Sequence, residues 1–127
     1  MRVLWVNEAA DFVGGCEQYI FNTARLLHDH GVRSSLLYDC QNRLSPDFVK
    51  PFEQAFPMVD IRTQVAEIKP DLIYVHRLSG RRIVEELRET RVPAARFFHL
   101  LAQAPEAEIF FAFWLDFCFR SGQTKRR

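Results

Sequence analysis

The sequence predicts an α/β fold in residues 1–100, with a parallel sheet flanked by helices. Short apolar runs rich in β-branched and aromatic residues recur along this part of the chain. Segments of about ten to fifteen residues with apolar side chains at helical spacing lie between them. Strands that alternate with helices in this way imply βαβ units and a Rossmann-like sheet.

The first half of this region predicts a strand, a helix and a second strand. Residues 2–6, RVLWV, form a run without polar alternation, which is typical of a strand covered on both faces. A helix is expected from about Cys16 to His30, and Gly31 ends it. A strand is expected at 34–38, whereas 39–57 contains three prolines and is predicted to be irregular.

The second half repeats the pattern. Asp60 is the predicted N-cap of a helix that runs to Lys69, where Pro70 ends it. Ser79 is the predicted N-cap of the next helix. The remaining elements are a strand at 72–75, a helix at about 80–90 and a strand at 95–98.

Length and charge limit the function classes. The 127 residues suit one domain, and the 48% hydrophobic content excludes a disordered chain. Seventeen basic residues against sixteen acidic ones leave a net charge of +1, so no nucleic-acid partner is predicted.

The cysteines and apolar runs indicate the compartment. Cys16, Cys40 and Cys118 are odd in number and form no CxxC pair, which argues against a disulfide framework and against a zinc site. No signal-peptide pattern opens the chain, and the longest apolar run, 109–119, is shorter than the roughly 20 residues of a membrane helix. We expect a cytoplasmic protein, and contact with the inner face of the membrane stays open.

Ligands of an open parallel sheet bind beyond the carboxyl ends of the strands. Three places in this chain fit that rule: the loop of residues 7–18, His76 and His99. Each histidine is either a ligand-binding group or an ordinary side chain hydrogen-bonded to a neighbouring loop. His28 and His30 lie on the first helix without sharing a face, and we expect both to be solvated.

Gly14 and Gly15 stand directly before the first helix. Without side chains they allow a phosphate to approach the backbone N–H groups and the positive end of the helix dipole. Glu17 in the first turn complements the same dipole, so it is also interpreted as a helix cap. The motifs GxGxxG and GxxxxGK[ST] are absent, which disfavours an NAD oxidoreductase and a P-loop NTPase.

Three segments together resemble the N-terminal domain of GT-B glycosyltransferases of the large retaining family 4. They are MRVLWVN, VGGCEQYIFNTARLLHDHG with its GG-x-E motif, and VAEIKPDLIYVHRL with its K-P-D…H motif. FFH at 97–99 is similar to the strand that ends in a histidine beside the family's sugar-transfer centre. The resemblance covers about residues 1–99.

The resemblance implies transfer of a sugar from a nucleotide-sugar donor to a hydroxyl acceptor, with retention of configuration. It implies that Gly14, Gly15 and Glu17 form the loop that approaches the donor diphosphate. It also implies that His99 is a catalytic residue near the reacting sugar and that His76 lines the acceptor cleft. No metal and no cofactor other than the donor substrate is implied. Family members commonly build surface polysaccharide, lipopolysaccharide or glycolipid.

The chain also departs from the family pattern. The second, donor-binding domain is missing, so we expect the chain to be inactive unless a C-terminal or separate donor domain joins it. Leu100 and Leu101 stand where the family often has an Asp and further polar residues. Residues 101–127 form a hydrophobic and basic tail. Four interpretations of this tail stay open: a buried final helix, a cover for the missing partner's interface, a membrane contact, or a truncated and shifted reading of a longer gene.

A rival hypothesis is a non-catalytic α/β binding module, or an acceptor subunit that pairs with a separate catalytic chain. The donor nucleotide, the sugar and the acceptor are not indicated by any residue here. The irregular residues 39–57 serve either acceptor selection or plain loop packing.

Overall fold

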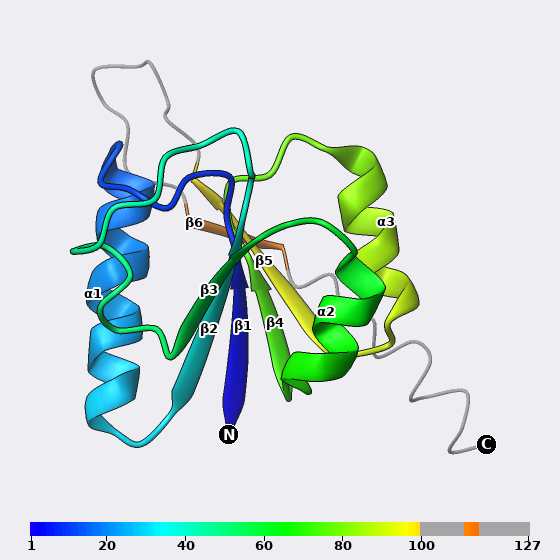
Figure 1. The fold of residues 1–127 in the computed structure, drawn as a ribbon, viewed down its shortest axis with the longest axis horizontal. Coiled ribbons are helices and arrows are strands. Elements are labelled where there is room, and N and C mark those ends of the chain that lie inside the picture. Colours follow the sequence, from blue (N-terminus) through cyan, green and yellow to red (C-terminus); the bar gives the residue numbers. More distant parts are fainter. Residues whose placement is uncertain (100–110, 115–127) are drawn as a thin grey trace.

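The computed structural model describes residues 1–99 and 111–114, which form one six-stranded sheet with helices on both faces (Figure 1). The strand order across the sheet is β3-β2-β1-β4-β5-β6. The elements in chain order are β1 (Arg2–Val6), α1 (Gly15–Asp29), β2 (Arg33–Tyr38), β3 (Gln54–Pro57), α2 (Ile61–Ile68), β4 (Leu72–Val75), α3 (Arg81–Glu89), β5 (Ala94–His99) and β6 (Phe111–Trp114).

Strand β1 lies in the middle of the parallel part of the sheet, as predicted. It pairs in parallel with β2 on one side and with β4 on the other, and β3 and β5 continue the parallel sheet outward. Residues 3–6 are at most 2% exposed, because both faces of this strand are covered by helices. The Rossmann-like α/β fold is therefore confirmed.

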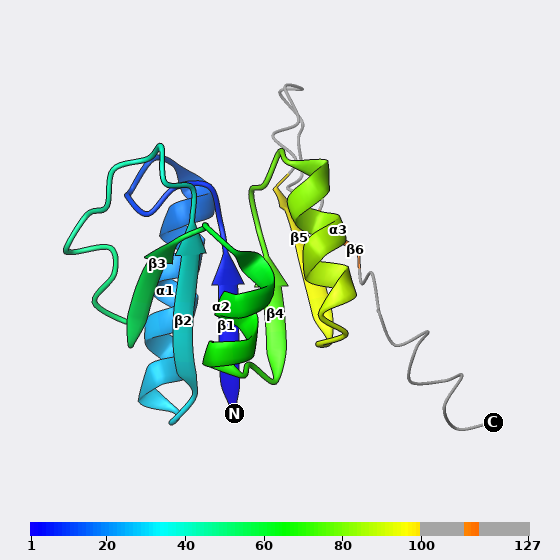
Figure 2. The same ribbon diagram turned by 45° about the vertical axis from the view of Figure 1, so that its right-hand side comes forward.

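The sheet divides the core into two layers (Figure 2). Successive side chains of a strand point to opposite faces. Trp5 accordingly packs with the apolar stripe of α1, whereas Leu4 and Val6 pack with α2 and α3. The loop after β1 therefore leads into a helix on one face of the sheet, and the loop after β4 leads into a helix on the other face.

The prediction that residues 39–57 are irregular is wrong at its end, where β3 forms. Ser35–Tyr38 of β2 pair in register with Gln54–Pro57. Pro57 is compatible with this strand because β3 is at the edge and one side needs no N–H donors. Phe48 and Phe52 are buried beside Trp5, which supports loop packing as the role of the aromatic residues in this segment.

One predicted helix cap is confirmed and the other is wrong. Asp60 caps α2, and its Oδ1 accepts a hydrogen bond from the Thr63 N–H at 3.3 Å. Gly80, not Ser79, is the N-cap of α3. The Ser79 N–H donates to Glu8 Oε1 at 2.6 Å, which ties the start of this helix to the loop after β1.

Strand β6 was not predicted. Residues 111–114 pair antiparallel with β5, so a final helix is the wrong interpretation for these four residues. The rest of the predicted tail, 101–110 and 115–127, lies outside the described residues, as do Leu100 and Cys118. Within the described part of the chain, no helix combines the length and the apolar character needed to cross a membrane.

Candidate functional site

The order of the strands reverses between β1 and β4. From β1 the chain proceeds to β2 and β3 on one side, and from β4 it proceeds to β5 on the other. In doubly wound sheets such a switch point leaves a crevice beyond the carboxyl ends, where ligands bind. The two loops at this place are residues 7–14 and 76–80, and both lie at the top of Figure 1.

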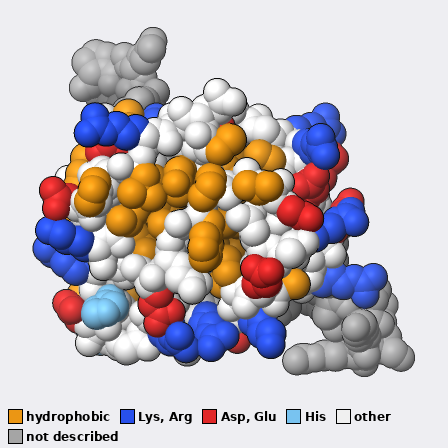
Figure 3. Space-filling view, in the orientation of Figure 1, with side chains coloured by type: hydrophobic (Ala, Val, Ile, Leu, Met, Phe, Trp, Pro, Cys, Tyr) orange, Lys and Arg blue, Asp and Glu red, His pale blue; other side chains and the backbone are white. Residues whose placement is uncertain are grey.

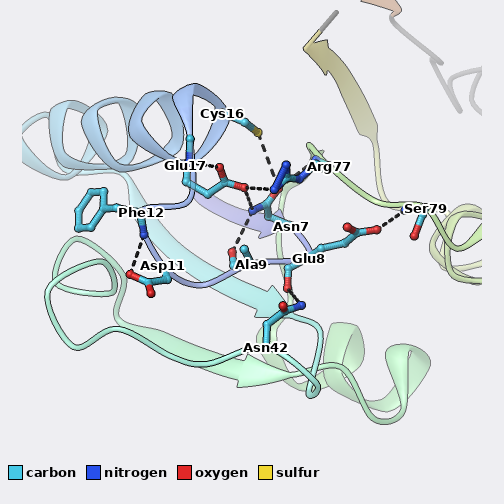
Figure 4. Close-up of polar contacts among 11 residues, drawn as sticks. Asn7, Glu8, Ala9, Asp11, Phe12, Cys16, Glu17, Asn42, Arg77 and Ser79 are labelled. Carbon is cyan, nitrogen blue, oxygen red and sulfur yellow. Dashed lines mark hydrogen bonds and ion pairs between the residues drawn. The ribbon is translucent and has the colours of Figure 1, made fainter. Parts of the chain in front are cut away.

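These two loops are bonded to each other (Figure 4). Asn7 Oδ1 accepts from the Arg77 N–H at 2.9 Å, and the Glu8 N–H donates to the Arg77 carbonyl at 2.8 Å. The hydrogen bond from the Ser79 N–H to the Glu8 carboxylate is a further link between the same two loops. Segments about 70 residues apart in the chain thus form one rim.

Glu17 holds the start of α1 onto this rim. Its side chain is completely buried, and Oε1 lies 3.2 Å from Asn7 Nδ2 and 3.3 Å from Arg77 Nη2. Its other oxygen accepts from the Gly14 N–H at 3.1 Å. The interpretation of Glu17 as a helix cap is confirmed, and its carboxylate also orients the half-exposed Arg77.

Cys16 is buried beside this carboxylate. Its Sγ lies 3.8 Å from Asn7 Oδ1. Burial raises the pKa of the Cys16 thiol to about 11, and the negative charge of Glu17 contributes in the same direction. Cys16 is therefore a protonated packing residue at neutral pH, whereas Cys40 is exposed.

Gly14 and Gly15 lie exposed at the start of α1. A Cβ added to Gly15 would meet no atom within 4 Å among the described residues, and one added to Gly14 would meet only Glu17 Oε2, at 3.8 Å. The first N–H groups of a helix have no acceptor inside the helix. Among the described residues, this corner of the rim therefore leaves space and donors for an anion.

His76 is held in a cluster of aromatic rings at the end of β4. Its ring is stacked on Trp5 at 5.3 Å between centroids and is tilted against Tyr74 at 4.3 Å. Although only 2% exposed, it lines a pocket of about 320 Å³ at the carboxyl edge. The other residues of this pocket are Glu8, Arg77, Leu78, Ser79, Arg96 and Phe97.

His99 is the last residue of β5, not the residue after it, and pairs with Phe111 of β6. Because β4 and β5 are parallel, His99 lies at the same edge of the sheet as His76 and the glycines. The surroundings of the His99 side chain lie outside the described residues. His28 and His30 are exposed, as expected.

Two polar residues of this edge were not singled out from the sequence, Arg77 and Arg96, and Glu8 was included only as part of the loop of residues 7–18. Glu8 and Arg77 follow a strand end by two residues, so the rule used for the histidines applied to them as well. Arg96 is a charged residue that stands between apolar residues in the strand AARFFH. Its Nη2 donates to the Leu78 carbonyl at 2.8 Å, which draws β5 and the β4–α3 loop together.

Comparison of this chain with protein-family models, with curated proteins and with solved structures finds no match. The site is therefore characterised by its own geometry. No group of three or more His, Cys, Asp or Glu side chains suited to a metal ion occurs within residues 1–99 and 111–114.

Proposed function

We propose that this chain is the acceptor-side, N-terminal domain of a retaining glycosyltransferase that uses a nucleotide-sugar donor. In this proposal it forms one wall of a cleft, and a donor-binding domain forms the other wall. The domain would act in the cytoplasm, and its acceptor would lie at the inner face of the membrane.

The observation that carries the proposal is that the family-like motifs lie along one edge of the sheet, at and beside the switch point. GG-x-E begins α1, the K-P-D…H motif ends at His76 after β4, and FFH ends β5, all at one edge of the sheet. A donor diphosphate and an acceptor hydroxyl must lie close together for transfer. Motifs from three strand ends at one edge meet that requirement.

Each residue then has a distinct role. Gly15 and the first N–H groups of α1 would receive the donor diphosphate, because no described residue fills the space next to Gly15. Glu17 would fix the glycine loop by accepting from the Gly14 N–H, and His76 would line the acceptor pocket. His99 is the proposed catalytic residue beside the reacting sugar.

The proposal is tested with pyrophosphate as a probe of the diphosphate site. Titration of the ¹⁵N-labelled chain should shift the amide signals of Gly14, Gly15 and Cys16. Gly15→Val should abolish these shifts, because its methyl groups occupy the space that the phosphate needs, and Gly15→Ala should weaken them less. Both variants should stay folded, since a Cβ at this position meets no described atom within 4 Å.

Shifts that persist unchanged in Gly15→Val would contradict the proposal. A second measurement separates it from a non-catalytic binding module. Extending the chain by the coding sequence that follows it in its own DNA should create release of nucleoside diphosphate from a nucleotide sugar. A binding module would show no such release, with or without the extension.

A further inference from the structure

Glu8 brings a carboxylate to the pocket of about 320 Å³ that His76 lines, which we call the edge pocket. The backbone of Glu8 is held on both sides. Its N–H donates to the Arg77 carbonyl at 2.8 Å, and its carbonyl accepts from the Asp39 N–H at 3.0 Å and from Asn42 Nδ2 at 2.8 Å. The point from which this side chain extends into the pocket wall is therefore fixed.

The carboxylate of Glu8 is only partly used by the protein. Its side chain reaches toward the β4–α3 loop, where Oε1 accepts from the Ser79 N–H (Figure 4). A carboxylate can accept about four hydrogen bonds. Within residues 1–99 and 111–114, no donor engages Oε2 of Glu8. The pocket wall thus holds an acceptor that is available to a ligand.

The acidic residues of α3 have different surroundings. Figure 3 shows basic and acidic side chains together over α3, at the margin of a central apolar area. Each glutamate of this helix forms an ion pair with an arginine: Glu85 with Arg81, Glu86 with Arg82 and Glu89 with Arg62.

Glu8 forms no ion pair with any residue that the structure describes. Arg77 lines the same pocket, but its guanidinium pairs with the buried Glu17, with 3.3 Å between Arg77 Nη2 and Glu17 Oε1. The Glu8 carboxylate is therefore not committed to a charged partner in the described part of the chain.

The other walls of the edge pocket restrict what can lie beside this carboxylate. Leu78 and Phe97 supply apolar surface, and the His76 ring supplies aromatic surface. A ligand that displaces water from Glu8 must donate a hydrogen bond in return, because a buried acceptor without a donor is costly. A hydroxyl group on a carbon skeleton meets both requirements.

We propose that Glu8 binds and orients the hydroxyl group of the acceptor. The hydroxyl donates to the Glu8 carboxylate while the carbon skeleton packs on Leu78 and Phe97. Binding of a hydroxyl ligand stands on the pocket alone, and its identity as the acceptor rests on the proposed function. A hydroxyl held in one orientation is prepared for attack on the donor sugar.

Titration of the ¹⁵N-labelled 127-residue chain with methyl α-D-glucopyranoside, a neutral hydroxyl probe, tests this inference. The amide signals of Glu8, Leu78 and Ser79 should shift. Glu8→Gln should raise the Kd about tenfold or more, the loss expected for one hydrogen bond to a charged group. Glutamine keeps an oxygen for the Ser79 N–H and replaces the other oxygen by a donor, so the bond between the loops is preserved.

Asp11→Asn is the matched control. It removes the same charge from the same loop, at a side chain that accepts from the Phe12 N–H at 2.8 Å and does not line the edge pocket. It should change the Kd less than about twofold. Glu8→Asp is a second variant: it keeps the charge but draws the carboxylate back by one methylene group, and it should also weaken binding.

Equal Kd values for Glu8→Gln and Asp11→Asn, or no binding of the glucoside to the unsubstituted chain, would overturn the inference. Glucosamine that binds about tenfold more tightly than the glucoside would overturn the assignment to a hydroxyl, since an ammonium group would then be the preferred partner of Glu8. Gly15→Val should leave glucoside binding unchanged. Failure of the pyrophosphate test therefore counts against the proposed function alone, and failure here counts against the role of Glu8 alone.

Discussion

The buried carboxylate of Glu17 connects three parts of the rim: the end of β1, the start of α1 and the loop after β4. It accepts from Asn7 and Gly14 and forms an ion pair with Arg77. Buried charges are stable only when such partners surround them. Glu17 is thus the residue whose loss should disturb both the fold and the geometry of the glycine loop.

Glu17→Gln should lower the free energy of unfolding by about 2 kcal/mol, because one amide NH₂ then faces donors and Arg77 loses its buried counter-charge. Urea denaturation at pH 7 measures this. Glu67→Gln, at an exposed position of α2, should cost less than about 0.5 kcal/mol. Similar losses in the two variants would contradict the role assigned to Glu17.

Cys16 should make stability depend on pH in the alkaline range. The pKa of its thiol in the folded chain is about 11, above the usual value of about 8.5 for a solvated thiol. Between these values the unfolded chain loses this proton and the folded chain keeps it, so stability falls as pH rises from about 8.5 to 11.

Cys16→Ala should flatten this part of the stability curve, because alanine does not titrate. Cys40→Ala should leave it unchanged, since Cys40 is already exposed in the folded chain. Thermal unfolding from pH 8 to pH 10.5 compares the three proteins. The same slope in all of them would show that burial of Cys16 is not its cause.

Helix α1 carries the glycine loop at one end and a left-handed turn at the other. Gly14 before the helix has an extended backbone, with φ of −166°. Gly31 after the helix has φ of +81°, where a side chain is strained. The N–H groups of Gly31 and Val32 close the helix by donating to the carbonyls of His28 and Leu27.

Gly31→Ala should therefore lower the free energy of unfolding by about 1 kcal/mol, the cost of a left-handed alanine. Gly15→Ala is the comparison at the other end of α1, and it should be neutral within about 0.5 kcal/mol. Urea denaturation distinguishes them. A larger loss in Gly15→Ala would mean that the open space before the helix is needed by the fold itself.

The strand order places loops that lead to both faces of the sheet around one crevice. Loop 7–14 leads into α1, and loop 76–80 leads into α3 on the opposite face. The hydrogen bonds of Asn7 and Glu8 with Arg77 join these two loops. The site therefore forms only when β1 and β4 lie side by side, and neither βα unit contains it alone.

The 127-residue chain by itself should show no sugar transfer from any nucleotide sugar. In the proposed function the chain forms only one wall of a cleft, so the donor would stay in contact with water and its diphosphate would lack the enclosing groups that stabilise a departing charge. Release of nucleoside diphosphate from a panel of nucleotide sugars is the measurement. Turnover by the chain alone would mean that a second domain is unnecessary or that a second copy replaces it.

Local patterns were sufficient for β1, β2, β4, β5 and the three helices. The run RVLWV, the capping residue Asp60 and the stop at Gly31 act within a few residues of themselves, so the sequence shows them directly. Parallel pairing of these strands then brings Gly14, Gly15, His76 and His99 to one edge. Each of these inferences needs only periodicity, caps and the rule for parallel sheets.

Long-range contacts decided the rest. The short strand β3 exists because β2 offers it a partner, and the Ser79 N–H is bonded to Glu8, 71 residues away in the chain. The bond from Asn7 to Glu17 and the pair of Glu17 with Arg77 join residues that no sequence period relates. The hydrogen bond from Arg96 to the Leu78 carbonyl likewise needs β5 packed beside the β4–α3 loop. Hydrogen bonds and charges act through space, so side chains distant in the chain become neighbours only when the sheet and its helices assemble.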